Sequence, residues 1–276
     1  MNRLFTNGAE DWALLGGNAL LIRTGGGRFT QDIDLARQGE LPDQAALQDE
    51  LQSYCQPQSE HDLWSFDIQG VVVHNSTDQY GYGTQAMKAK VISRLGTQIF
   101  ESFSIDITQR RHVDSPVDLV PLRAVISDQA HGDLVSVPTI PVENHLADKI
   151  CAMYERHGPE QKPSTRMRDL ADIVRILQQL PFDAERLCTV LDREVGRRKM
   201  QLPSEIVAPG SNWATDFPNA AKDFAEYPVE LRPVEASLEV AGQCLNQILA
   251  GDRRDGTWEP KSSLWVDQSG ASEAEA

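Results

Sequence analysis

Short apolar runs alternate with glycine-containing turns in the first half of the chain, a pattern typical of a β-sheet. Residues 12–15 form an apolar run that ends at Gly16-Gly17, and residues 18–24 have helical spacing before three glycines at positions 25–27. Alternation of polar and apolar residues predicts further strands at residues 30–36, 64–74 (or a hairpin turning at Gly70), 87–95 and 99–108. We therefore expect a mixed sheet with few helices over residues 1–140.

After Pro141 the apolar residues recur every three or four positions, which predicts helices. The expected buried stripes are Leu146, Ile150 and Met153, then Met167, Leu170, Val174 and Leu177, and then Leu187, Val190, Leu191 and Val195. The second helix has a start signal at Ser164, and the third extends over residues 179–200. The sequence thus predicts an α+β fold, in which the mixed-sheet domain is followed by a helical domain over residues 141–251. Residues 252–276 are polar and acidic, so we expect them to form a flexible acidic tail.

The composition is that of a globular chain, with 40% hydrophobic residues in 276. It has no run of about 20 apolar residues and no apolar signal-peptide core, so we expect a cytoplasmic protein without a membrane partner. Four scattered cysteines favour neither zinc nor disulfides. The net charge of −15 argues against a nucleic-acid partner, although residues 145–200 carry 11 Lys and Arg against nine Asp and Glu.

Two carboxylates on one predicted strand are the strongest candidates for a metal site. On a strand, residues two apart share a face, so the side chains of Asp32 and Asp34 converge. The pairs Asp183/Glu185 and Asp192/Glu194 fall on a predicted helix, where they diverge. A divalent cation relieves the repulsion between two close carboxylates, and Mg²⁺ suits hard oxygen ligands and phosphates. The alternative is an exposed strand face that carries two solvated acids.

A possible phosphate site precedes this strand. Glycines let phosphate oxygens approach the backbone, and the N–H groups at a helix start attract anions. Gly16-Gly17 stands before a predicted helix and about fifteen residues before the acidic pair. A tight connection without a ligand remains the alternative.

A third carboxylate, Asp106, lies in the centre of the last predicted strand. Phe103, Ile105 and Ile107 share one face of that strand, which leaves Asp106 on the other with Ser104 and Thr108. Three carboxylates could hold two metal ions, and Asp106 could accept the proton of an attacking hydroxyl. A solvent-facing edge strand is the alternative.

The combined motifs resemble the AbiEii/AbiGii family of nucleotidyltransferase toxins. The resemblance extends over residues 10–180 and rests on residues 16–20 (GGNAL), 28–30 (RFT) with 32–35 (DIDL), 147–149 (ADK) and 166–173 (RMRDLADI). The chain departs from the wider superfamily in having Gly17 where a serine is frequent, and in a slightly long segment before Asp32.

The resemblance implies a polymerase-β-like minimal nucleotidyltransferase fold followed by a helical domain. It implies a toxin with a cognate antitoxin, in a family in which some members add nucleotides to the ends of tRNA. It also implies that Lys149 contacts the nucleotide phosphates and that Asp169 completes the active site; solvated ion pairs are the alternative for both. The expected nucleotide-binding residues are Gly16, Gly17, Asn18, Arg28, Thr30 and Lys149.

We therefore predict a nucleotidyltransferase that transfers a nucleoside monophosphate from an NTP to a hydroxyl, at the 3′ end of tRNA. The cofactor would be Mg²⁺ or Mn²⁺, held by Asp32, Asp34 and Asp106. Small-molecule or protein acceptors, and a catalytically silent binding module, are the alternatives. If tRNA binds, the expected docking surface is a basic helix end formed by Arg193, Arg197, Arg198 and Lys199, whose alternative reading is a solvated helix terminus.

Overall fold

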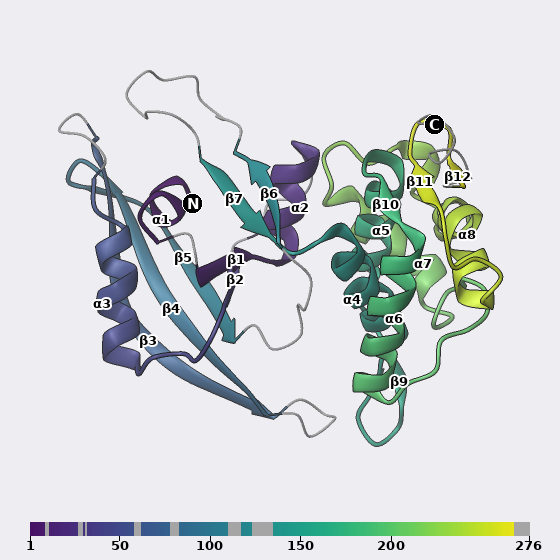
Figure 1. The fold of residues 1–276 in the computed structure, drawn as a ribbon, viewed down its shortest axis with the longest axis horizontal. Coiled ribbons are helices and arrows are strands. Elements are labelled where there is room, and N and C mark those ends of the chain that lie inside the picture. Colours follow the sequence, from purple (N-terminus) through teal and green to yellow (C-terminus); the bar gives the residue numbers. More distant parts are fainter. Residues whose placement is uncertain are drawn as a thin grey trace, which may run out of the picture. The chain divides into compact units, whose positions relative to one another are not determined.

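The computed structural model describes residues 1–8, 11–26, 30, 32–57, 62–77, 83–109, 117–122 and 135–267. The chain divides into two compact units, Met1–Pro141 and Val142–Ala276, whereas the sequence predicts a boundary after residue 140. A mixed sheet dominates the first unit and helices dominate the second, which confirms the predicted α+β class (Figure 1). Among the described helices, none has the length and apolarity needed to cross a membrane.

The first unit is built on a seven-stranded sheet with the order β3-β4-β5-β2-β1-β7-β6. β2 pairs with β5 and β1 with β7 in parallel, and the other neighbours are antiparallel. The strands are β1 (Trp12–Leu14), β2 (Asp32–Arg37), β3 (Trp64–Thr77), β4 (Gly83–Leu95), β5 (Gln98–Gln109), β6 (Asp118–Pro121) and β7 (Ser136–Thr139). The helices are α1 (Asn2–Gly8), α2 (Gly16–Thr24) and α3 (Gln44–Tyr54).

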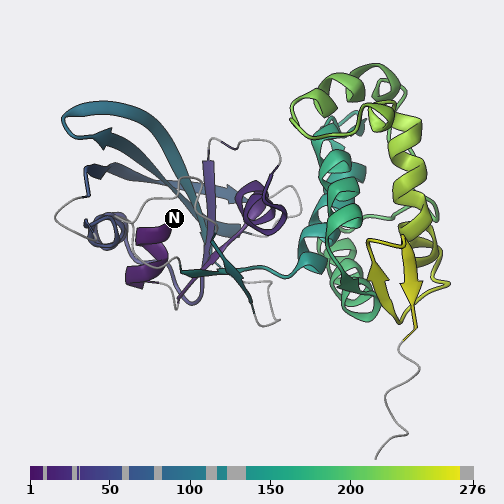
Figure 2. The same ribbon diagram turned by 90° about the horizontal axis from the view of Figure 1, so that it is seen from above.

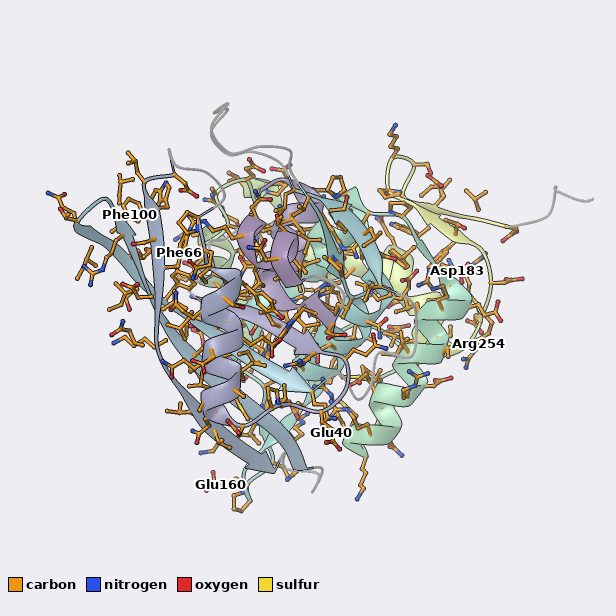
Figure 3. All side chains as sticks on the ribbon, turned by 60° about the vertical axis from the view of Figure 1, so that its left-hand side comes forward. Glu40, Phe66, Phe100, Glu160, Asp183 and Arg254 are labelled. Atoms are coloured by element: carbon orange, nitrogen blue, oxygen red, sulfur yellow. The ribbon has the colours of Figure 1, made fainter. Side chains whose placement is uncertain are left out.

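Strand β3 differs from the hairpin considered at Gly70. It is one strand with a bulge between Ile68 and Gly70. The extra residue shifts the alternation, so that Ile68 and Val71, three positions apart, both point into the core. The hairpin between β4 and β5 forms where the sequence predicts it, and Phe100 packs edge-on against Trp64 of β3 at 4.9 Å between ring centroids. Figure 3 shows Phe66 and Phe100 at the same end of the sheet.

Helix α3 covers one face of the sheet and protects its edge strand, although the sequence analysis did not predict this helix. Asp43 caps its first turn by accepting a hydrogen bond from the Ala46 amide. Three glutamines spaced four apart donate to backbone carbonyls of β3, and they are Gln44, Gln48 and Gln52. Unpaired edge groups invite pairing with other chains, so these side chains take the place of a neighbouring strand. Helix α1 packs beside α3 on the same face (Figures 1 and 2).

The face beneath α3 forms the core of the first unit. Leu47 and Leu51 of α3 meet apolar residues of β2, β4 and β5. The buried members of those strands are Leu35, Met87, Ala89, Val91, Ile105 and Ile107. Because strand residues alternate, their polar neighbours point to the opposite face.

The second unit consists of helices and five short strands. Its helices are α4 (Val142–Tyr154), α5 (Met167–Gln179), α6 (Ala184–Arg198), α7 (Trp213–Lys222), the 3₁₀ helix η3 (Val229–Leu231) and α8 (Val234–Ala250). Its strands are β8 (Arg156–His157), β9 (Lys162–Pro163), β10 (Phe182–Asp183), β11 (Thr257–Glu259) and β12 (Leu264–Val266). The predicted helix over residues 179–200 is interrupted by β10, after which Asp183 caps α6 by accepting from the Arg186 amide (Figure 3).

The predicted flexible tail from residue 252 is wrong as far as residue 267. β11 and β12 pair with each other and with β10 in a three-stranded sheet. Trp258 is buried, and its indole N–H donates to the Leu177 carbonyl at 2.7 Å. Trp265 donates in the same way to the Cys244 carbonyl at 3.1 Å. The two tryptophans supply apolar area that the polar composition of this segment conceals. Residues 268–276 lie outside the described residues.

Candidate active site on the open face of the sheet

The polar residues of β4, β5 and β2 form two adjacent rows on the face opposite α3. Each row crosses the three strands in register, because β4 pairs antiparallel with β5 and β5 pairs parallel with β2. The rows are Lys88–Asp106–Asp34 and Lys90–Ser104–Asp32. The structure therefore brings together the three carboxylates singled out in the sequence, from strands that lie about seventy residues apart in the chain.

Lys88 lies between two of these carboxylates. Its Nζ is 3.2 Å from Asp106 Oδ1 and 3.9 Å from Asp32 Oδ1. All three side chains are partly open to solvent, with exposed fractions of 34% for Lys88, 38% for Asp106 and 47% for Asp32. Lys88 was not predicted as a site residue, although the alternation around Met87 and Ala89 already places it on the polar face.

Gly16 brings the start of α2 against the third carboxylate. Its φ is +60°, in the left-handed region that favours glycine. A Cβ at this position would lie 2.0 Å from Asp34 Oδ2, which means that the carboxylate occupies the space of a side chain. Asn18, two residues later, donates to the Asp32 carbonyl at 2.7 Å. The predicted Gly16-Gly17 turn therefore fixes the relation between α2 and β2.

A cavity of about 990 Å³ opens over the same face. Asn18, Thr30 and Asp32 line it together with Lys88 and Lys90. The buried Thr30 hydroxyl has no hydrogen-bond partner among the described residues, so it can bond to a ligand. Further lining residues are Ile33, Gln69, Gly70, Val72, Glu101, Ser102, Phe103 and Ser104. Arg28, an expected nucleotide-binding residue, lies outside the described part of the chain.

The carboxylates suit a hard divalent cation in their chemistry. As placed, the described residues contain no group of three or more His, Cys, Asp or Glu side chains that could hold a metal ion. Mg²⁺, however, is usually bound by one or two carboxylates together with substrate phosphates. Asp32 and Asp106 both approach one cation, the Lys88 ammonium, so the two carboxylates lie close enough to share a positive charge.

Lys149 and Asp169, the other two predicted site residues, meet in the second unit. Lys149 Nζ lies 3.2 Å from Asp169 Oδ1 and 2.6 Å from Asp172 Oδ2, and all three side chains are buried. Arg166 contacts the second oxygen of Asp169 at 2.7 Å. Burial by itself lowers the pKa of Lys149, but the carboxylates of Asp172 and Asp169 outweigh burial and raise that pKa. Asp172, which the sequence analysis did not single out, is thus a direct partner of Lys149.

The expected RNA-docking surface at the end of α6 is largely neutralised by carboxylates. Arg198 is buried and forms ion pairs with Asp148, Glu155 and Glu194. Arg197 pairs with Glu194 at 2.8 Å. The prediction that Arg198 presents its charge to RNA is wrong, because this side chain is buried among acids. An RNA contact of Arg197 stays a prediction.

Solved structures include a protein with a similar fold. The chain resembles MenT4, a nucleotidyltransferase toxin from Mycobacterium tuberculosis, with a TM-score of 0.52, 16% identity, and coverage of 90% of this chain and 80% of that one. It also resembles JHP933 from Helicobacter pylori, with a TM-score of 0.47, 13% identity, and coverage of 91% and 88%. None of the curated proteins matches the chain.

The family model described as "Nucleotidyl transferase AbiEii toxin, Type IV TA system" matches residues 2–240. This range includes both rows of polar residues on the face of the sheet opposite α3, and it includes the ion-pair cluster around Lys149. The chain therefore belongs to the AbiEii nucleotidyl transferase toxin family, and it is a nucleotidyltransferase toxin of a type IV toxin–antitoxin system.

Proposed function

We propose that this toxin transfers a nucleoside monophosphate from an NTP to the 3′-terminal hydroxyl of a tRNA, using Mg²⁺ or Mn²⁺. The observation that carries the chemistry is the convergence of Asp32 and Asp106 on one cation at the wall of a large cavity. Family membership supports the NTP substrate and an antitoxin partner. The resemblance of the motifs supports the tRNA acceptor, and growth inhibition by the toxin would follow from blocked tRNA ends.

In this proposal Asp32 and Asp106 hold the divalent cation, and Asp34, the register partner of Asp106, is the third ligand. The cation, when bound, stabilises the charge that develops on the triphosphate. Asp106 accepts the proton of the attacking hydroxyl. The hydroxyl oxygen forms a bond to the α-phosphorus while the bond to the β-phosphate oxygen breaks, so that pyrophosphate leaves.

Other residues orient the nucleotide. Thr30 and Asn18 line the cavity, and the Thr30 hydroxyl is available to a phosphate or ribose oxygen. The backbone of Gly16 and Gly17 at the start of α2 favours an anion. By resemblance to the family, Lys149 contacts the nucleotide phosphates and Asp169 completes the active site. Their buried ion pairs with Asp172 and Arg166 give them a structural role as well.

The test is transfer of label from NTPs labelled at the α-phosphate. Purified toxin is incubated with Mg²⁺ and, in separate reactions, with total tRNA, tRNA whose 3′ end has been oxidised by periodate, and a protein extract. We expect label in intact tRNA and none in oxidised tRNA, because oxidation removes the attacking hydroxyl. Label in protein, or consumption of NTP without labelled RNA, would overturn the tRNA acceptor. No NTP consumption with any acceptor would contradict the catalytic assignment of the open face.

A further inference from the structure

Lys88 and Lys90 line the same cavity but have different surroundings. Lys88 lies between the carboxylates of Asp106 and Asp32, at 3.2 and 3.9 Å. Lys90 is exposed, its register partner on β5 is Ser104, and it forms no ion pair with a described residue. The two lysines therefore add the same charge to the cavity, but Lys88 contacts the carboxylates and Lys90 does not.

The contacts of Lys88 explain how two carboxylates can lie close together on this face of the sheet. Two carboxylates on neighbouring strands repel each other, and a cation between them removes that repulsion. Ion pairs that are about one third exposed are weak, so Lys88 can be exchanged for a stronger cation. Its ammonium stands on a flexible four-carbon stem with three donors, which lets it reach a new anion within the same cavity.

We propose that Lys88 is the resident cation of the site: it holds Asp32 and Asp106 while the toxin is free of nucleotide, and it binds the phosphates of the NTP once a divalent cation takes those carboxylates. The inference rests on the proposed function, since it requires that Asp32 and Asp106 form the metal site. It makes Lys88 both a competitor of the metal and a ligand of the substrate.

Competition with the metal is measured with Mn²⁺ alone, by the loss of its free-ion EPR signal on titration with protein. We compare the wild type, K88M, K90M and D106N. We expect K88M to bind Mn²⁺ about fivefold more tightly than the wild type, because a competing cation held by weak ion pairs has been removed. K90M removes the same charge without a contact and should change the affinity by less than about threefold, the scale of a weak exposed interaction. D106N should lose the site.

Thermal unfolding gives a second readout that does not depend on activity. Without metal, K88M should unfold at a lower temperature than K90M, because its carboxylates are left facing each other. Saturating Mn²⁺ should raise the unfolding temperature of K88M more than that of the wild type, since tighter binding to the folded state stabilises it more.

Binding of the phosphates is measured at saturating Mn²⁺ with the α,β-methylene analogues of the four ribonucleoside triphosphates. We expect K88M to bind them about tenfold more weakly than the wild type, the scale of a lost charge-assisted contact, and K88R to recover most of the affinity.

Three outcomes would overturn the inference in distinguishable ways. Equal Mn²⁺ affinities of K88M and K90M, at a site that D106N abolishes, would refute competition by Lys88 and leave the metal site intact. Tighter Mn²⁺ binding with unchanged analogue binding in K88M would refute its phosphate contact. A wild type without a Mn²⁺ site sensitive to D106N would refute the proposed metal site, and the inference with it.

Discussion

The substitution Gly16→Ala tests whether the close approach of α2 to Asp34 serves the site. The new methyl carbon would be 2.0 Å from Asp34 Oδ2, whereas carbon and oxygen atoms need more than 3 Å. The carboxylate must therefore move by about 1 Å or more. A misplacement of about 1 Å in catalytic geometry can cost roughly 100-fold in rate. Alanine at φ +60° adds a backbone penalty of about 1–2 kcal/mol.

Gly96→Ala is the matched control for this strain. Gly96 has a φ of +58°, almost that of Gly16, and a Cβ there would meet nothing within 4 Å. Gly96→Ala should lose about 1–2 kcal/mol of unfolding free energy in urea titrations, and Gly16→Ala should lose at least as much, because its clash with Asp34 adds to the same backbone penalty. Only Gly16→Ala should also lose about 100-fold of its NTP-transfer rate, while Gly96→Ala stays within about twofold of the wild type. If the two variants transferred at similar rates, the position of Asp34 would not matter for catalysis.

Three further predictions concern the carboxylates, the buried cluster and the sheet edge. Asp32→Ala should abolish transfer without unfolding the protein, as checked by transfer assay and calorimetry, and near-normal turnover would exclude Asp32 as a metal ligand. Lys149→Met should lower the unfolding free energy by about 3–5 kcal/mol in urea titrations, because it removes the cation that contacts the buried carboxylates of Asp169 and Asp172. Because folding raises the pKa of Lys149, the stability that Lys149 contributes is fully present below the ordinary lysine pKa of 10.5 and is lost as the pH rises through the raised pKa of the folded protein. A Lys149→Met variant as stable as the wild type would argue against a structural role. Gln52→Ala should cost about 1–3 kcal/mol by leaving two β3 backbone groups unpaired. Gln56→Ala, at an exposed position just after the helix, should be neutral within about 0.5 kcal/mol.

Local alternation predicted the strands and the direction of their side chains. The spacing of Asp32 and Asp34 places both on one face, and the pattern of β5 places Asp106 opposite Ile105 and Ile107, as the structure shows. The neighbours of each strand follow from tertiary packing, which alternation does not encode. Lys88 was therefore missed, because its importance depends on β4 lying beside β5 and β5 beside β2.

The elements that were missed or wrong have identifiable causes. Helix α3 carried a signal, since Leu47 and Leu51 are four apart after the capping residue Asp43, but its many glutamines dilute the apolar stripe. Strands β11 and β12 have three residues each, too few for a periodic pattern. Trp258 and Trp265 order these strands, but two apolar side chains barely change the mean polarity of the segment. In the second unit, resemblance marked Lys149 and Asp169, whereas the role of Asp172 appeared only from the distance to Lys149.

The alternation of Asp106 with the buried Ile105 and Ile107 also restricts how β5 aligns with β2. A slip by one residue would turn Asp106 toward the face beneath α3, where Ile105 and Ile107 are buried, and a carboxylate there would cost several kcal/mol. A slip by two residues would keep the face but move Asp106 roughly 7 Å along the strand, away from its counterpart. The alternation of acids with buried apolar residues thus restricts strand alignment. A chain misaligned here loses its catalytic geometry and, for an odd shift, its core. A one-residue insertion within β5 should accordingly yield misfolded protein rather than a folded but inactive toxin.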